Sequence, residues 1–103
     1  MGKVIVLPEL AYKLNDLITT LYKEDYFGFL DSAKEYVITI FDFIYIIPEQ
    51  RRKRTKNSNK GTWYCKYKHN RSTTWYITFD VEEDIYLIKD ITNNHTEEYL
   101  GII

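Results

Sequence analysis

Two stretches decide the fold of this chain, Trp63-Tyr64-Cys65-Lys66-Tyr67-Lys68 and Trp75-Tyr76-Ile77-Thr78-Phe79-Asp80-Val81. In both, large apolar side chains recur at every second position, which is the periodicity of a β-strand with one buried face. The polar segment from His69 to Thr73 separates them, so a β-hairpin is predicted. Glu82-Glu83-Asp84 marks a second turn, and Ile85 to Ile91 a third strand that completes an antiparallel meander. The buried face of that third strand stays open, because its odd and even positions are equally apolar.

Upstream of the hairpin, the apolar period changes from two to about 3.6 residues. Lys3 to Leu7 is a short β-branched run that predicts a first strand, and a helix is predicted from Pro8 to Lys23, with a break near Gly28. The Ser32-Ala33-Lys34-Glu35 capping box predicts the start of a second helix, which Pro48 ends. The alternative is a strand, since Tyr36 to Ile47 is rich in residues that favour sheets.

The segment from Glu49 to Gly61 contains no apolar residue, and it is predicted to be a mobile loop. The element order is then β, α, α, β, β, β, followed by a tail from Thr92 to Ile103. This order predicts a single α+β domain over residues 1–103, in which a helical hairpin packs on one face of a small antiparallel sheet. The other face is expected to be exposed.

Composition limits the class of protein. The 103 residues are 45% hydrophobic and 17% aromatic, which excludes an intrinsically disordered chain. Cys65 is the only cysteine, so no intramolecular disulfide forms, and no signal segment opens the chain. The longest apolar run, Tyr36 to Pro48, is too short to cross a bilayer. A cytoplasmic protein without a membrane partner is expected.

Positive charge is concentrated in one part of the chain. Nine of the fourteen Lys and Arg residues lie between Arg51 and Arg71, and none of the fifteen acidic residues does. We call residues 51–71 the basic zone. A zone of this density attracts phosphate groups or an acidic partner, although the net charge of the whole chain is only −1.

The predicted hairpin places several cations on its outer face. If Trp63, Cys65 and Tyr67 pack under the helices, then Tyr64, Lys66 and Lys68 point to the opposite face, and Arg71 in the turn can reach the same region. Lysine supplies point charges and arginine a bidentate fork, both of which suit a phosphodiester. The alternative is an ordinary solvated strand face.

His95 is the best acid/base candidate, because a neutral imidazole can accept or donate a proton near physiological pH. It lies in the polar stretch Thr92-Asn93-Asn94-His95-Thr96, with Tyr99 four residues further on. The alternative is a surface histidine in a tail. Cys65 is expected to be a buried, inert thiol. No metal-ligand spacing joins the two histidines and the cysteine, so neither a metal nor a cofactor is expected.

The remaining cations of the basic zone are candidates to follow a nucleic-acid backbone, or they simply solvate a loop. Two tyrosines on the outer face are candidates to stack on bases. The predicted nucleic-acid-binding residues are Arg51, Arg52, Lys53, Arg54, Lys56, Lys60, Tyr64 and Tyr76.

Two segments carry a resemblance to a known family: Lys66-Tyr67-Lys68-His69-Asn70-Arg71-Ser72-Thr73-Thr74-Trp75-Tyr76-Ile77-Thr78-Phe79-Asp80 and Ile91-Thr92-Asn93-Asn94-His95. With the element order above, the chain resembles the RelE/ParE superfamily of bacterial toxin-antitoxin modules. Members like RelE cleave mRNA on the ribosome without metal, using basic residues, an arginine and often a C-terminal histidine or tyrosine. Members like ParE share the fold and poison DNA gyrase.

The resemblance implies site residues and partners. By position, Lys66 and Lys68 match the basic residues of a strand, Arg71 the arginine, and His95 the C-terminal catalytic position, with Tyr99 a looser match. The expected partners are a cognate antitoxin, the ribosome and mRNA, or gyrase in the alternative. The chain would be a monomer or part of a toxin-antitoxin hetero-oligomer. An inactive relative that only binds nucleic acid or an antitoxin is the third possibility.

Overall fold

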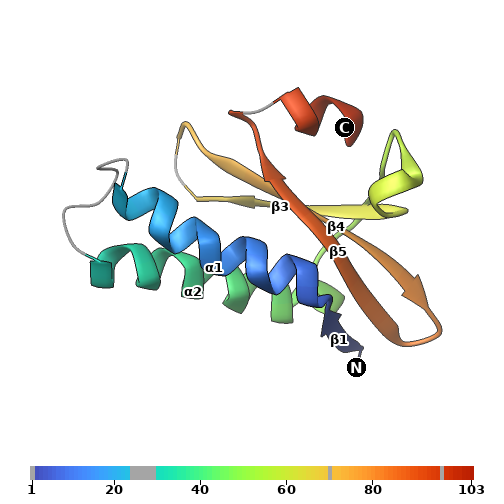
Figure 1. The fold of residues 1–103 in the computed structure, drawn as a ribbon. Coiled ribbons are helices and arrows are strands. Elements are labelled where there is room, and N and C mark those ends of the chain that lie inside the picture. The colour runs from blue at the N-terminus through green and yellow to red at the C-terminus, as the bar shows by residue number, and fades with distance from the viewer. Residues whose placement is uncertain (1, 24–29, 70, 96) are drawn as a thin grey trace.

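The helices of this protein cover one face of a five-stranded sheet (Figure 1). The computed structural model describes residues 2–23, 30–69, 71–95 and 97–103. Within these ranges, residues 18, 20–23, 30–32, 58 and 98 are described by their backbone alone. The α+β class predicted from the sequence is confirmed. The helices and strands are β1 (Lys3–Val6), α1 (Pro8–Lys23), α2 (Leu30–Tyr45), β2 (Lys53–Arg54), β3 (Trp63–Lys68), β4 (Thr74–Glu82) and β5 (Ile85–Asn93). Three 3-10 helices complete the fold, η1 (Ile47–Glu49), η2 (Ser58–Lys60) and η3 (Glu97–Gly101).

The sheet has the order β1-β5-β4-β3-β2. The meander of β3, β4 and β5 is antiparallel as predicted, but the sheet as a whole is mixed rather than antiparallel, because β1 adds to it in parallel beside β5. A bulge interrupts the last pairing, since Thr78 lies opposite Asp90 while Phe79 lies opposite Ile88. The extra residue explains why both Ile88 and Ile91 reach the helix-facing core, although they are three positions apart. No fixed alternation could have predicted the buried face of β5.

Both helices were correctly predicted from their apolar stripes. Leu10 and Leu14 of α1 and Ile40 and Ile44 of α2 are fully buried in one core with Phe79 of the sheet. The helix α2 begins at Leu30, two residues before the predicted capping serine, so Ser32 does not cap it. The side chain of Ser32 and the predicted break at Gly28 lie outside the described residues. No described helix has the length and apolarity that crossing a membrane requires.

The prediction of a plain loop between Glu49 and Gly61 is wrong in part. β2 pairs with β3, and the backbone N–H of Thr55 donates to the carbonyl of Thr62 over 2.9 Å. The Thr55 hydroxyl is buried and donates to the carbonyl of Gly61 over 2.6 Å. Strand pairing at a sheet edge uses backbone groups and leaves charged side chains in solvent, so it needs no apolar residue. The apolar pattern therefore carried no signal for β2.

The outer face of the sheet was predicted to be exposed, but part of it is covered. The C-terminal η3 lies on the side opposite the helices (Figure 1), and Tyr99 and Ile102 pack over Tyr64 and Tyr76 there. Two backbone bonds fix the segment, from the N–H of Lys56 to the carbonyl of Ile102 (2.7 Å) and from the N–H of Asn57 to the carbonyl of Gly101 (3.0 Å). These contacts form a second, small core on the outer face of the sheet.

Asp90 joins three elements beside the bulge. β1 ends opposite Ile88, and beyond that point Lys13 of α1 reaches β5, donating to Asp90 Oδ1 (2.9 Å) and to the carbonyl of Ile91 (2.8 Å). Lys60 lies 3.5 Å from the other carboxylate oxygen. Burial alone would raise the pKa of Asp90, but the bonds from Lys13 and from the N–H of Ile91, with the charge of Lys60, hold that pKa below its usual value.

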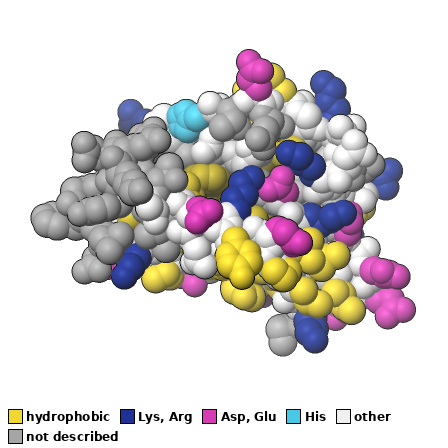
Figure 2. All heavy atoms as spheres, viewed as in Figure 1, with side chains coloured by type: hydrophobic (Ala, Val, Ile, Leu, Met, Phe, Trp, Pro, Cys, Tyr) yellow, Lys and Arg dark blue, Asp and Glu magenta, His cyan; other side chains and the backbone are white. Residues whose placement is uncertain are grey.

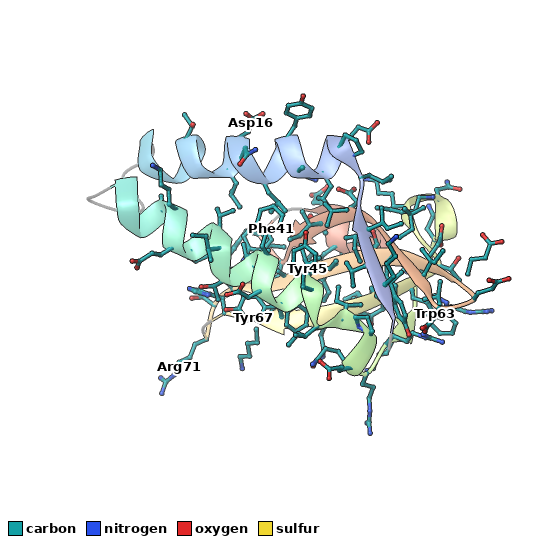
Figure 3. All side chains as sticks on the ribbon, turned by 90° about the horizontal axis from the view of Figure 1, so that it is seen from below. Asp16, Phe41, Tyr45, Trp63, Tyr67 and Arg71 are labelled. Carbon is teal, nitrogen blue, oxygen red and sulfur yellow. The ribbon has the colours of Figure 1, made fainter. Side chains whose placement is uncertain are left out.

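This arrangement predicts a loss of stability in acid. A carboxylate whose pKa is lowered by folding stabilises the fold above its unfolded pKa, about 4, and that contribution disappears as pH falls through the folded pKa. We expect Asp90→Asn to cost about 1 kcal/mol of unfolding free energy at pH 7 and to weaken the pH dependence below pH ~4. Urea unfolding at pH 7 and pH 3 measures both effects. Asp16→Asn, on the outer side of α1 (Figure 3), is the control, and equal behaviour of the two variants would contradict the prediction.

Candidate functional site

The end of the β3–β4 hairpin is tied to the end of β5. The N–H of Asn94 donates to the carbonyl of Thr74 (3.2 Å), and the N–H of Thr74 donates to Asn94 Oδ1 (3.0 Å). The side-chain amide of Asn94 also donates to the carbonyl of Ser72 (2.9 Å). One asparagine thus fixes the chain that leaves β5 against the hairpin turn. In the sequence Asn94 is one residue of a polar stretch, and its role depends on contacts across strands that form only on folding.

His95 follows this clamp and is exposed. Its Nε2 lies 2.9 Å from the hydroxyl of Thr73, and its backbone N–H donates to Asn93 Oδ1 over 2.9 Å. His95 is a surface histidine, and its ring is held at the turn that also carries Arg71. Thr73 is a further residue that sequence analysis missed, since only the folded chain brings it to His95.

Two lysines stand on the neighbouring strand. Lys68 lies opposite Thr74 and Lys66 opposite Tyr76, and both side chains are exposed as predicted. Adjacent strands lie about 4.8 Å apart, so β3 is about 10 Å from β5 at this end of the sheet. Within the described chain, neither lysine makes an ion pair or a hydrogen bond. We call Lys66, Lys68, Arg71, Thr73 and His95 the hairpin-end site.

Arg71 extends away from the body of the protein at this end, as Figure 3 shows. Its side chain is exposed and pairs with no carboxylate among the described residues. The site thus combines an exposed, oriented imidazole with cations that pair with no acidic side chain in the part of the chain that the structure describes. Chemically, such a group can transfer a proton beside an anion whose charge the cations stabilise.

The structure does not bring Tyr99 to His95. Tyr99 stacks on Tyr76 with ring centroids 5.6 Å apart and 22° between the ring planes. Only 7% of Tyr64 and 8% of Tyr76 is exposed, so their rings are not open to bases as predicted, because Tyr99 and Ile102 cover them. Burial, with the neighbouring phenols of Tyr99 and Tyr64, raises the pKa of Tyr76. Its hydroxyl therefore stays protonated at neutral pH.

The cover over these tyrosines should contribute measurably to stability. Ile102 is buried against them while the adjacent Ile103 is exposed, which provides a matched pair of variants. We expect Ile102→Ala to lower the unfolding free energy by about 2 kcal/mol and Ile103→Ala to change it by less than about 0.5 kcal/mol. Urea unfolding measures the two. Equal losses would show that the segment does not pack as described.

The basic zone divides between two ends of the sheet. Trp63 and Arg71 lie at opposite ends of β3 (Figure 3). The guanidinium carbons of Arg52 and Arg54 lie 4.6 Å and 5.3 Å from the centroid of the Trp63 ring, far from the hairpin-end site. Trp63 is only half-buried, less than predicted, because these arginines rather than the helices cover part of its ring.

The other cations of the basic zone differ in whether they pair with an acidic side chain. Lys60 pairs with Asp90 and is not available to a nucleic acid without breaking that contact. Arg51, Lys53 and Lys56 are exposed. Figure 2 shows Lys, Arg, Asp and Glu side chains mixed over the middle of one face, with apolar side chains gathered over β1 and the first turns of α1.

Cys65 and His69 lie on the helix-facing side of the same strand and its turn. Burial raises the pKa of Cys65 to about 11, although the charge of Arg52 opposes the shift, so the thiol is neutral as expected. His69 packs against Tyr36 with ring centroids 4.1 Å apart, and its Nδ1 is 3.3 Å from the hydroxyl of Tyr67. Both residues are therefore part of the packing under α2.

Comparison of the chain with protein-family models, with curated proteins and with solved structures finds no match. Among the described residues, no three His, Cys, Asp or Glu side chains gather into a group that would hold a metal ion.

Proposed function

We propose that this chain is a toxin-like, metal-independent endoribonuclease of the RelE/ParE kind, which cuts mRNA on the ribosome and is neutralised by a cognate antitoxin. The observation that carries the proposal is the anchored His95. Its ring is held 2.9 Å from Thr73 in the turn of the most basic hairpin of the chain. The helical hairpin on one sheet face also agrees with the layout that the resemblance implies.

The proposed reaction uses the RNA itself as nucleophile. The 2′-hydroxyl attacks the adjacent phosphorus and loses its proton to a general base, the P–O5′ bond breaks, and a general acid protonates the leaving 5′ oxygen. His95 serves as one of these groups and a lysine as the other. Arg71, Lys66 and Lys68 stabilise the charge that develops on the phosphorane. The products are a 2′,3′-cyclic phosphate and a 5′-hydroxyl.

Expression in bacteria tests the proposal at low cost. Growth should stop, and mRNA from the arrested cells should be cut within translated regions while chromosomal DNA remains intact. DNA breaks with intact mRNA would instead select a gyrase poison. Continued growth at a confirmed level of protein would favour an inactive relative that only binds nucleic acid or an antitoxin.

One observation favours the non-enzymatic alternative, a toxin that binds gyrase through its helices. The solvent sides of α1 and α2 carry large apolar residues, with Tyr12, Ile38 and Tyr45 exposed by 72%, 56% and 59%. A helix face that binds another protein would use such exposed apolar side chains as its anchors. Tyr12→Ser and Ile38→Ser would abolish arrest by this route and leave arrest by RNA cleavage intact.

A further inference from the structure

The outer edge of β2 is open to another strand. β2 is the last strand of the sheet and pairs only with β3. Because the N–H of Thr55 points to β3, the alternation of an extended chain directs the N–H and C=O of Arg54 away from the sheet. The next outward donor, the N–H of Lys56, is already bound by the carbonyl of Ile102. The chain's own C-terminal segment thus pairs with the edge at Lys56, and no residue in the described ranges pairs with the edge at Arg54.

The side chains at this edge form a fixed pair of cations. Arg52 and Arg54 both lie over Trp63, and Arg52 Nη1 also donates to the hydroxyl of Tyr86 over 3.4 Å. No described carboxylate pairs with either guanidinium. Two like charges held over one indole ring repel each other, and an anion placed between them relieves that repulsion.

The outward backbone groups of Arg54 favour an acidic peptide over an RNA strand as the bound anion. An RNA strand offers mainly acceptors along its phosphates, which would face the outward carbonyl of Arg54. An extended peptide offers both N–H and C=O groups, and its side chains at alternate positions fall on one face. Acidic residues two positions apart match the spacing of Arg52 and Arg54, about 6.8 Å along a strand.

We infer that the β2 edge, Arg52 to Arg54 with Trp63, binds an extended acidic segment of a partner protein, which adds to the sheet as a further strand. The inference does not depend on RNA cleavage, because the edge lies at the opposite end of β3 from the hairpin-end site. Its affinity comes from backbone bonds to Arg54 and from carboxylates beside the two guanidinium groups.

A peptide probe tests this directly. A fluorescent, capped nonapeptide of alternating Glu and Val should bind the full chain, and its binding should weaken as salt rises. Arg54→Gln, which removes only the charge, should weaken binding about tenfold, and Arg54→Pro should weaken it roughly fivefold more. Proline removes the outward N–H but no bond to β3. Lys34→Gln on α2 makes the same charge change elsewhere and should have no effect.

Amide hydrogen exchange provides a second readout that needs no variant. The Arg54 amide should exchange more slowly in the complex, and the same peptide N-methylated at its valines should not protect it. The inference is overturned if the Arg54→Gln and Arg54→Pro variants bind the peptide equally and the Arg54 amide of the wild-type chain stays unprotected. Binding would then depend on charge alone and not on strand pairing. It is also overturned if the peptide does not bind at low salt, or if a uridine decamer binds the edge more tightly and displaces it.

Discussion

Replacing His95 or Arg71 by alanine should reduce mRNA cleavage by roughly 100- to 10,000-fold while leaving the unfolding free energy almost unchanged. Among the described residues, His95 is an exposed imidazole held against the basic hairpin, and Arg71 supplies a guanidinium in its turn. Both side chains lie on the surface and fill no part of either core. The measurement is single-turnover cleavage of mRNA on programmed ribosomes, with urea unfolding of the same preparations.

Matched variants separate three effects on the cleavage rate: proton transfer by His95, the loss of any one surface cation, and the orientation of the His95 ring. Lys34→Ala removes one exposed cation from α2 and should leave cleavage unchanged. Thr73→Val removes the hydroxyl that holds the His95 ring and should reduce the rate by a smaller factor than His95→Ala does. Added imidazole should partly restore His95→Ala. If both alanine variants cut at the wild-type rate, the chain is still an endoribonuclease, but the hairpin-end site is not its active site.

Gly61→Ala should be the most destabilising of the small substitutions, costing about 3 kcal/mol of unfolding free energy. Gly61 has φ +138°, a backbone conformation that L side chains rarely adopt. A Cβ there would lie 2.9 Å from the backbone nitrogen of Phe79 and 3.1 Å from the Cβ of Thr78, and the sheet backbone cannot move aside cheaply. Gly61 therefore lets the chain enter β3 close to β4.

Gly101→Ala is the control, because a Cβ at Gly101 would meet nothing within 4 Å. It should change the unfolding free energy by less than about 0.5 kcal/mol. Thermal or urea unfolding of the two alanine variants compares them directly. A loss of similar size at both positions would mean that the entry into β3 is not as tight as described.

The sequence predicted the elements whose apolar residues are periodic. Leu10 and Leu14 marked the buried stripe of α1, and the alternation around Cys65 gave β3 with the correct inward face. Ile88 and Ile91 show the limit of that method. A bulge in β5 places both in the core, and a bulge depends on pairing with β4 that no periodicity records.

The candidate site was predictable as a set of residues and not as an arrangement. His95 and Lys68 were chosen for their chemistry, and the fold brings them to the same end of the sheet. Thr73 and Asn94 were missed because their roles depend on contacts across strands. Tyr64 and Tyr76 were assigned to an open face because the tail containing Ile102 has no periodicity to show that it covers them.

The most direct test of the proposed activity is cleavage of a defined mRNA on programmed ribosomes by the purified wild-type chain, with the new ends identified chemically. Attack by the 2′-hydroxyl predicts a 2′,3′-cyclic phosphate on the upstream fragment and a 5′-hydroxyl on the downstream fragment. A message with a single 2′-deoxy nucleotide at the cut position should resist cleavage there and be cut elsewhere as before. Cleavage of the 2′-deoxy position at the normal rate, or an mRNA that remains intact, would contradict the proposal.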